Sequence, residues 1–103
     1  MLKRIATVAA ALTALLGIGA GTALASTFVA YEGDHFTGRQ QVVRACGVSN
    51  ITYHGSYKWY SDGQSGRMFN TPNAQGSAVF TLASNRNAEQ LTGFGWRSID
   101  IIC

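Results

Sequence analysis

The sequence contains few of the residues that build reactive or nucleic-acid-binding sites. One proline, two cysteines and two histidines occur among 103 residues, and 13% of the residues are charged. Beyond Lys3 and Arg4 at the start, no two basic residues are adjacent. Nucleic-acid-binding domains normally carry a clustered basic surface. We therefore expect no nucleic-acid partner.

Catalytic motifs are also absent. The chain has no GxSxG turn and no HExxH helix, which are the arrangements that activate a serine or hold a catalytic zinc ion. His35 lies in the turn-rich stretch YEGDHFTGR, and His54 lies in ITYHGS, so both are interpreted as loop residues. The sequence predicts no catalytic residues and a protein that is not an enzyme.

The one long hydrophobic run stands at the N-terminus. Residues 5–25 carry no charge and follow the basic start MLKR, which is typical of a secretory signal peptide. A retained membrane anchor is the alternative, since about 20 apolar residues can span a bilayer. The small residues Ala23 and Ala25 favour cleavage after Ala25. We predict a signal peptide over residues 1–25, a domain over residues 26–103, secretion, and no stable membrane anchor after cleavage.

Removal of this segment changes the charge balance. The full chain has a formal net charge of +3, and Lys3 and Arg4 contribute two of its eight basic residues. Six basic and five acidic residues remain, so the formal net charge of residues 26–103 is +1. The basic character of the chain therefore belongs partly to the predicted signal peptide.

Two cysteines, Cys46 and Cys103, lie in the predicted exported domain. An even number of cysteines in an exported chain favours a disulfide. In the chain-entropy model, a loop of this length stabilises the fold by roughly 4 kcal/mol. A metal pair or a catalytic thiol is the alternative, but neither cysteine has a neighbouring ligand at metal-binding spacing.

The rest of the chain has the pattern of an all-β protein. Short apolar and aromatic runs alternate with segments rich in glycine, asparagine, aspartate and serine, at the spacing expected of successive strands. Residues 87–94, NAEQLTGF, could form one short helical turn that Gly93 ends. Two packed sheets around one core fit the alternation better than a single sheet.

Three residues of the first turn have a characteristic spacing. Tyr31, Phe36 and Gly38 resemble the signature of the βγ-crystallin family, in which the first hairpin folds back over the sheet. The resemblance implies a Greek-key β-sandwich of two sheets and a later hydroxyl that supports the hairpin. Ser98 in WRSIDII is the best match for that hydroxyl, and Ser56 is a second match. Residues 60–67, YSDGQSGR, resemble the first turn and suggest a second unit.

Many microbial βγ-crystallins bind calcium, and SDGQSG is the nearest stretch to that motif here. It offers Asp62 and Ser65 as weak calcium candidates, but Ser61 and Gly66 replace residues that the motif needs. Calcium binds through six to eight oxygen atoms. We therefore expect no cofactor, with calcium as the open alternative.

The size and export of the domain are similar to those of Streptomyces killer-toxin-like proteins of the same superfamily. This resemblance implies a small secreted antimicrobial or antifungal protein that binds a cell-wall or cell-surface component of a competitor and acts as a monomer. Aromatic and cationic side chains suit such binding. The predicted contacts are Tyr57, Lys58, Trp59, Tyr60 and Arg67, with Tyr57 and Trp59 as core residues in the alternative interpretation.

Two other functions remain open. A Streptomyces metalloprotease inhibitor also resembles this fold, and residues 70–77, NTPNAQGS, would be the loop that occupies a protease cleft. A structural, calcium-stabilised crystallin-type protein is the third class.

Overall fold

The computed structural model describes residues 26–103, and the predicted signal peptide, residues 1–25, lies outside the described residues. No helix within residues 26–103 has the length and apolar character needed to cross a membrane. The described part contains eight strands and one short 3-10 turn. They are β2 (Thr27–Gly33), β3 (Thr37–Val43), β4 (Gly47–Asn50), β5 (Ser56–Tyr60), β6 (Ser65–Phe69), η1 (Pro72–Ala74), β7 (Phe80–Leu82), β8 (Ala88–Gln90) and β9 (Ser98–Ile102).

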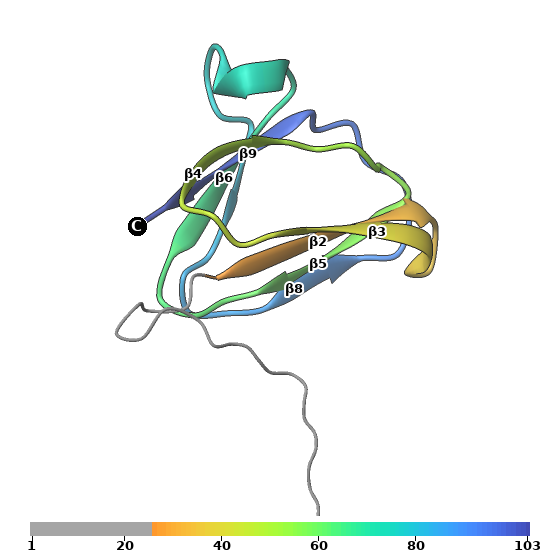
Figure 1. Cartoon of the computed structure of the whole chain (residues 1–103). Coiled ribbons are helices and arrows are strands. Elements are labelled where there is room, and N and C mark those ends of the chain that lie inside the picture. Colours follow the sequence, from red (N-terminus) through yellow and green to blue (C-terminus); the bar gives the residue numbers. More distant parts are fainter. Residues whose placement is uncertain (1–25) are drawn as a thin grey trace, which may run out of the picture.

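The strands form two four-stranded antiparallel sheets, which Figure 1 shows as separate layers. The first sheet has the order β3-β2-β5-β8, and the second has the order β4-β9-β6-β7. Each sheet therefore takes three strands from one half of the chain and one strand from the other half. This exchange of β4 and β8 makes two interlocked Greek-key motifs, and it confirms the predicted fold class.

The core lies between the two sheets. Phe28 and Trp59 of the first sheet and Met68 and Ile99 of the second are fully buried. Gly66 makes room for the largest of them, because a Cβ atom there would lie 3.3 Å from the Trp59 indole ring. The indole N–H donates to the Ala83 carbonyl at 2.8 Å, so its polar group is satisfied inside the core.

The predicted helical turn near residue 88 is wrong. Ala88–Gln90 is strand β8, and Lys58 and Trp59 of β5 pair with Glu89 and Ala88. The local helix propensity of these residues is weak compared with the gain from completing the first sheet, so the tertiary environment decides.

One side of the sandwich is closed where β3 leads into β4. The Gln41 side chain accepts from the Thr52 N–H at 2.7 Å and donates to the Asn50 carbonyl at 2.8 Å. Cys46 and Cys103 form a disulfide beside the β4–β9 ladder, with their Cα atoms 5.7 Å apart. These contacts tie the edge strand β4 to β9 of its own sheet and to β3 of the first sheet.

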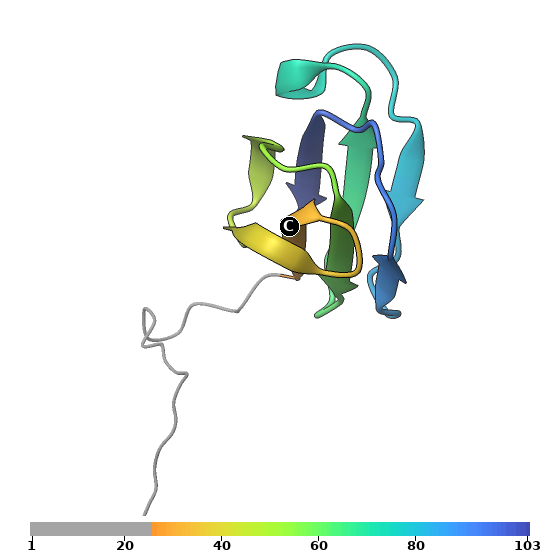
Figure 2. The same cartoon turned by 90° about the vertical axis from the view of Figure 1, so that its right-hand side faces the viewer.

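The opposite side is closed by residues 91–97, which we call the strap. Figure 2 shows this segment running along the side of the sandwich from β8 to β9. Phe94 and Trp96 of the strap pack against the core cluster, and the Trp96 ring stacks on Phe80 of the edge strand β7 at 4.9 Å. The strap thus covers the gap between the two short edge strands, β7 and β8.

Candidate recognition surface

The first hairpin, between β2 and β3, folds back over the first sheet. His35, Phe36 and Gly38 all have positive φ angles, 53°, 59° and 80°, which bend the chain sharply. Glycine adopts such angles easily, whereas other residues need outside support to hold them. The Phe36 ring packs at 5.5 Å from the ring of Tyr31.

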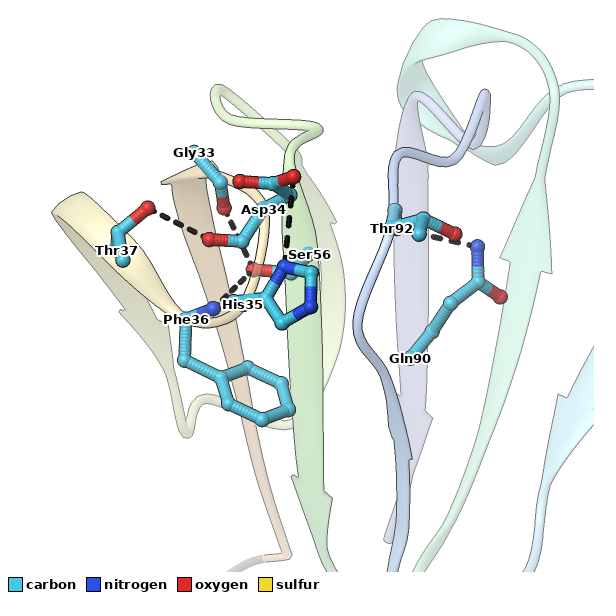
Figure 3. Close-up of polar contacts among 8 residues, drawn as sticks. All are labelled: Gly33, Asp34, His35, Phe36, Thr37, Ser56, Gln90 and Thr92. Atoms are coloured by element: carbon cyan, nitrogen blue, oxygen red, sulfur yellow. Dashed lines mark hydrogen bonds and ion pairs between the residues drawn. The ribbon is translucent and has the colours of Figure 1, made fainter.

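Ser56 supplies that support, as Figure 3 shows. The Phe36 N–H donates to the Ser56 hydroxyl oxygen at 2.9 Å, and the hydroxyl donates to the Gly33 carbonyl at 2.7 Å. Ser56 is fully buried beneath the hairpin. It therefore holds the hairpin on the sheet, the role that the sequence assigned first to Ser98.

Ser98 has the same role in the second half of the chain. The Ala74 N–H donates to its hydroxyl oxygen at 2.8 Å, and the hydroxyl donates to the Thr71 carbonyl at 2.6 Å. Asn73, Ala74 and Gly76 repeat the positive φ angles, at 63°, 53° and 80°. The second folded turn is therefore Phe69–Gly76.

The predicted second unit, residues 60–67, is thus in the wrong place. The spacing of Phe69, Ala74 and Gly76 equals that of Tyr31, Phe36 and Gly38. Alanine in place of the second aromatic conceals this match, and the spacing from the first aromatic to glycine is the signal that could have found it.

The outer face of the first sheet carries an exposed aromatic and aliphatic surface around one lysine. Lys58 of β5 lies opposite Val29 and Glu89, and its Nζ atom is 4.4 Å from the centre of the Phe36 ring. No carboxylate of the described residues forms an ion pair with it. The ammonium group is therefore held by the aromatic ring, a favourable cation–π arrangement.

Two further side chains extend this surface. Tyr60 and Val42 are each 45% exposed, and both follow the outward alternation of their strands. A shallow hollow beside β8 is lined by Lys58, Tyr60, Asn87 and Glu89, among others. We call Tyr31, Phe36, Val42, Lys58, Tyr60 and Glu89 together the first-sheet face.

The structure rules out two of the predicted surface contacts. Tyr57 is 3% exposed and Trp59 is fully buried, because both point from β5 into the core. Burial raises the pKa of the Tyr57 hydroxyl. Only their neighbours Lys58 and Tyr60 reach the surface, since successive side chains of a strand point to opposite faces.

The fifth predicted contact, Arg67, lies on the other sheet. Its guanidinium donates to the Asp100 carboxylate at 3.1 Å, across the outer face of β6 and β9. The structure therefore does not bring Arg67 together with Lys58 and Tyr60, because the outer faces of the two sheets point in opposite directions.

Charged residues of the first turn form local pairs. Arg39 donates to the Glu32 carboxylate at 2.7 Å, and this bond lowers the pKa of Glu32 and raises the pKa of Arg39. His35 lies 3.4 Å from Asp34, and both side chains are mostly exposed (Figure 3). The nearby Ser56 hydroxyl is engaged by the backbone of the hairpin rather than by this histidine.

Calcium binding at Asp62 and Ser65 stays a prediction. The Asp62 N–H donates to the hydroxyl oxygen of the buried Ser26 at 2.6 Å, and Ser65 pairs with Ile102 at the start of β6. Across residues 26–103, no group of three histidine, cysteine or acidic side chains has the arrangement of a metal site.

The family model described as MiAMP1 matches residues 26–103, the whole of the described domain. The chain belongs to the MiAMP1 family. This chain is similar to Antimicrobial peptide 1 of Pinus monticola, with 34% identity over 103 residues, covering 98% of this chain and 97% of that protein.

A solved relative supports the MiAMP1 assignment. The solution structure of MiAMP1, a plant antimicrobial protein, has a TM-score of 0.68 and 30% identity, and the match covers 75% of this chain and 99% of that one. The MiAMP1 family is thus one of antimicrobial proteins with a βγ-crystallin-like fold, which confirms the resemblance at the level of the superfamily. The finer likeness to Streptomyces killer-toxin-like proteins stays a prediction.

Proposed function

We propose that this MiAMP1-family chain is a secreted antimicrobial protein that acts, in the manner of a killer toxin, by binding at the surface or wall of a target cell. The likeness to an antimicrobial peptide over nearly the full length of both chains carries this proposal. The predicted signal peptide over residues 1–25 supports secretion. The protein acts as a monomer and by binding, without catalysis.

The first-sheet face supports the binding role. It offers an ammonium group without a carboxylate partner, set among exposed or half-buried aromatic rings. Aromatic side chains contribute large contact areas at recognition surfaces, and an unpaired cation adds attraction to anionic groups. On the second sheet, Asp100 occupies the position that Lys58 has on the first, and its charge is compensated by the ion pair with Arg67.

Growth inhibition of yeast by the purified, oxidised protein tests this function. A variant with Lys58→Gln and Tyr60→Ser removes the charge and the exposed ring of the first-sheet face. The matched control carries Arg67→Gln and Ile102→Ser on the second sheet, where Ile102 is 39% exposed and ends β9 as Tyr60 ends β5. We expect inhibition to fall at least tenfold in the first variant and to persist in the control.

The outcomes separate the function from the surface. A wild-type protein that leaves yeast and other fungal or bacterial cells unaffected contradicts the antimicrobial function. Equal activity of both folded variants contradicts the assignment of the first-sheet face alone.

Protease inhibition is the second candidate, favoured by the rigidity of residues 70–77. Hydrogen bonds from three side chains hold this exposed turn. The Ser98 hydroxyl bonds to the Thr71 carbonyl and the Ala74 N–H. The Thr71 hydroxyl donates to the Gln75 carbonyl at 2.6 Å, and the Asn50 side chain accepts the Asn73 N–H. A rigid loop is what an inhibitor needs to resist cleavage. Inhibition of a thermolysin-type protease without growth inhibition would favour this function.

A calcium-stabilised structural role would instead show as a melting temperature that rises with calcium and falls with a chelator.

A further inference from the structure

The middle of the strap rests on a histidine. His54 lies in the connection between β4 and β5, and its carbonyl accepts the Phe94 N–H at 3.0 Å. Its imidazole contacts the Phe94 ring edge-on at 5.4 Å. The backbone and the side chain of His54 therefore both hold the same point of the strap.

The imidazole is not fully satisfied in this position. Its Nε2 atom is buried without a hydrogen-bond partner. A neutral ring tolerates this, because the unprotonated nitrogen presents only a lone pair. A proton on Nε2 would bury a charged N–H group with no acceptor, which is costly in an apolar environment.

The charged surroundings add to this cost. Burial of the ring lowers the pKa of His54, and Arg97 at the end of the strap lowers it further as a like charge. A hydrogen bond to the Trp96 backbone opposes this shift. From β5, Tyr57 contacts the same Phe94 ring and is neutral, since its pKa is raised. None of these neighbours is an acid that could pair with an imidazolium.

The ends of the strap are held independently of His54. The Leu91 carbonyl accepts the His35 N–H at 2.7 Å, and the Arg97 N–H donates to the Phe69 carbonyl at 2.8 Å. The Arg97 carbonyl also accepts the Ile51 N–H at 2.9 Å. The Gln90 side chain of β8 also donates to the Thr92 and Gly93 carbonyls, at 3.3 and 2.8 Å. Residues 94–96 are therefore the part of the strap that can move while its ends remain attached.

Beneath the middle of the strap lies a continuous aromatic cluster. Phe94 contacts Phe28 at 6.2 Å and Tyr57 at 5.4 Å, and Trp96 contacts Tyr57 and the 43% exposed Phe80. Lifting the strap would uncover these rings. Large exposed apolar patches commonly mark sites of interaction with apolar partners.

We propose that the strap is an acid-sensitive cover, in which protonation of His54 releases Phe94 and Trp96 while the ends of the strap and both sheets stay in place. The direction of the pH effect follows because the closed state binds a proton more weakly than the open state. The closed strap is fully stable above the ordinary histidine pKa of about 6.5 and loses stability as the pH falls through that value. This device does not depend on the proposed antimicrobial function.

Hydrogen exchange and NMR of the oxidised protein between pH 7.5 and 4.5 test the proposal. We expect the protection factor of the Phe94 amide to fall at least about tenfold as the strap opens locally. The Trp96 indole resonance should shift with the same midpoint as the His54 ring protons. Amides of the β2–β5 ladder should keep their protection.

The two histidines of the chain give a matched control. His54→Gln should abolish the pH dependence at Phe94, whereas His35→Gln should leave it unchanged, because the His35 side chain is 64% exposed. Arg97→Gln should reduce the loss of protection, since it removes the like charge. Should His54→Gln fail to fold, the wild-type midpoints still decide.

Three results would overturn the proposal. They are a His54 titration without any change at Trp96 or Phe94, an unchanged pH dependence in folded His54→Gln, and a loss of protection in the β2–β5 ladder equal to that at Phe94. The last result would mean that acid unfolds the whole domain.

Discussion

The two halves of the chain build the same folded hairpin from different side chains. In the first half, the turn ends on Phe36, whose ring contacts Tyr31 and the Lys58 ammonium group. In the second half, the same backbone angles end on Ala74, and Asn73 at the corner bonds to the Asn50 side chain at 2.8 Å. The fold therefore requires the backbone angles and the supporting serine, whereas the side chains at the corner can differ and so determine the character of each surface.

The outer faces of the two sheets differ in the same way. Val29, Lys58 and Glu89 of the first sheet occupy the positions of Arg67, Asp100 and Val48 in the second. The second sheet therefore pairs its charges internally, whereas the first leaves Lys58 beside rings. This asymmetry is the reason to place recognition on the first-sheet face.

The largest effect is expected at Gly55, which has no space for a side chain, whereas Arg97 at the equivalent position beside the second hairpin carries one. The Gly55 N–H donates to the Tyr31 carbonyl at 2.8 Å, as the Arg97 N–H does to Phe69. A Cβ atom at Gly55 would collide with the backbone of Glu32 and Gly33. We expect Gly55→Ala to lower the free energy of unfolding by about 3 kcal/mol, the range of severe overpacking.

Denaturant unfolding measures this cost, with Arg97→Ala as the matched control. The exposed Arg97 side chain should change stability by no more than about 0.5 kcal/mol. Similar losses for both variants would show that the close approach at Gly55 is not the cause.

The next effect tests whether the two serines are equivalent. Ser56→Ala and Ser98→Ala each remove a buried hydroxyl that bonds to one N–H and one carbonyl of its hairpin. Each should cost about 2 kcal/mol, because the backbone groups left behind lose their partner. Hydrogen exchange should rise at the Phe36 amide in the first variant and at the Ala74 amide in the second. A rise at both amides in either variant would contradict independent hairpins.

The smallest effect concerns the corner residues themselves. Phe36→Ala should cost about 1 kcal/mol through the lost contacts with Tyr31 and Lys58. Ala74→Gly should change stability by less than about 0.5 kcal/mol, because relief of the positive φ angle offsets the greater flexibility of the unfolded chain. Thermal unfolding compares the two variants. A larger loss for Ala74→Gly than for Phe36→Ala would reverse the comparison.

The sequence predicted the first hairpin better than the second. Tyr31, Phe36 and Gly38 show the full aromatic and glycine spacing, whereas Phe69, Ala74 and Gly76 keep only its ends. Of the five predicted surface contacts, the structure brings Lys58 and Tyr60 together on the outer face of the first sheet, and the others lie elsewhere for a related reason. The alternation in SYKWY separates Tyr57 and Trp59 from Lys58 and Tyr60, yet both sets contain an aromatic, so polarity alone does not say which set faces the core.

By itself, the sequence determined the all-β class, the segments that form most of the strands and the sharp bend at residues 31–38. Those features depend on local patterns: alternation, turn residues and a glycine at positive φ. Only the tertiary structure decided that β4 and β8 exchange sheets and that Ala88–Gln90 is a strand. It also decided that the strap covers the side of the sandwich between β7 and β8, where it contacts His54. These outcomes depend on pairing between residues far apart in the chain, whose free energy no local pattern contains.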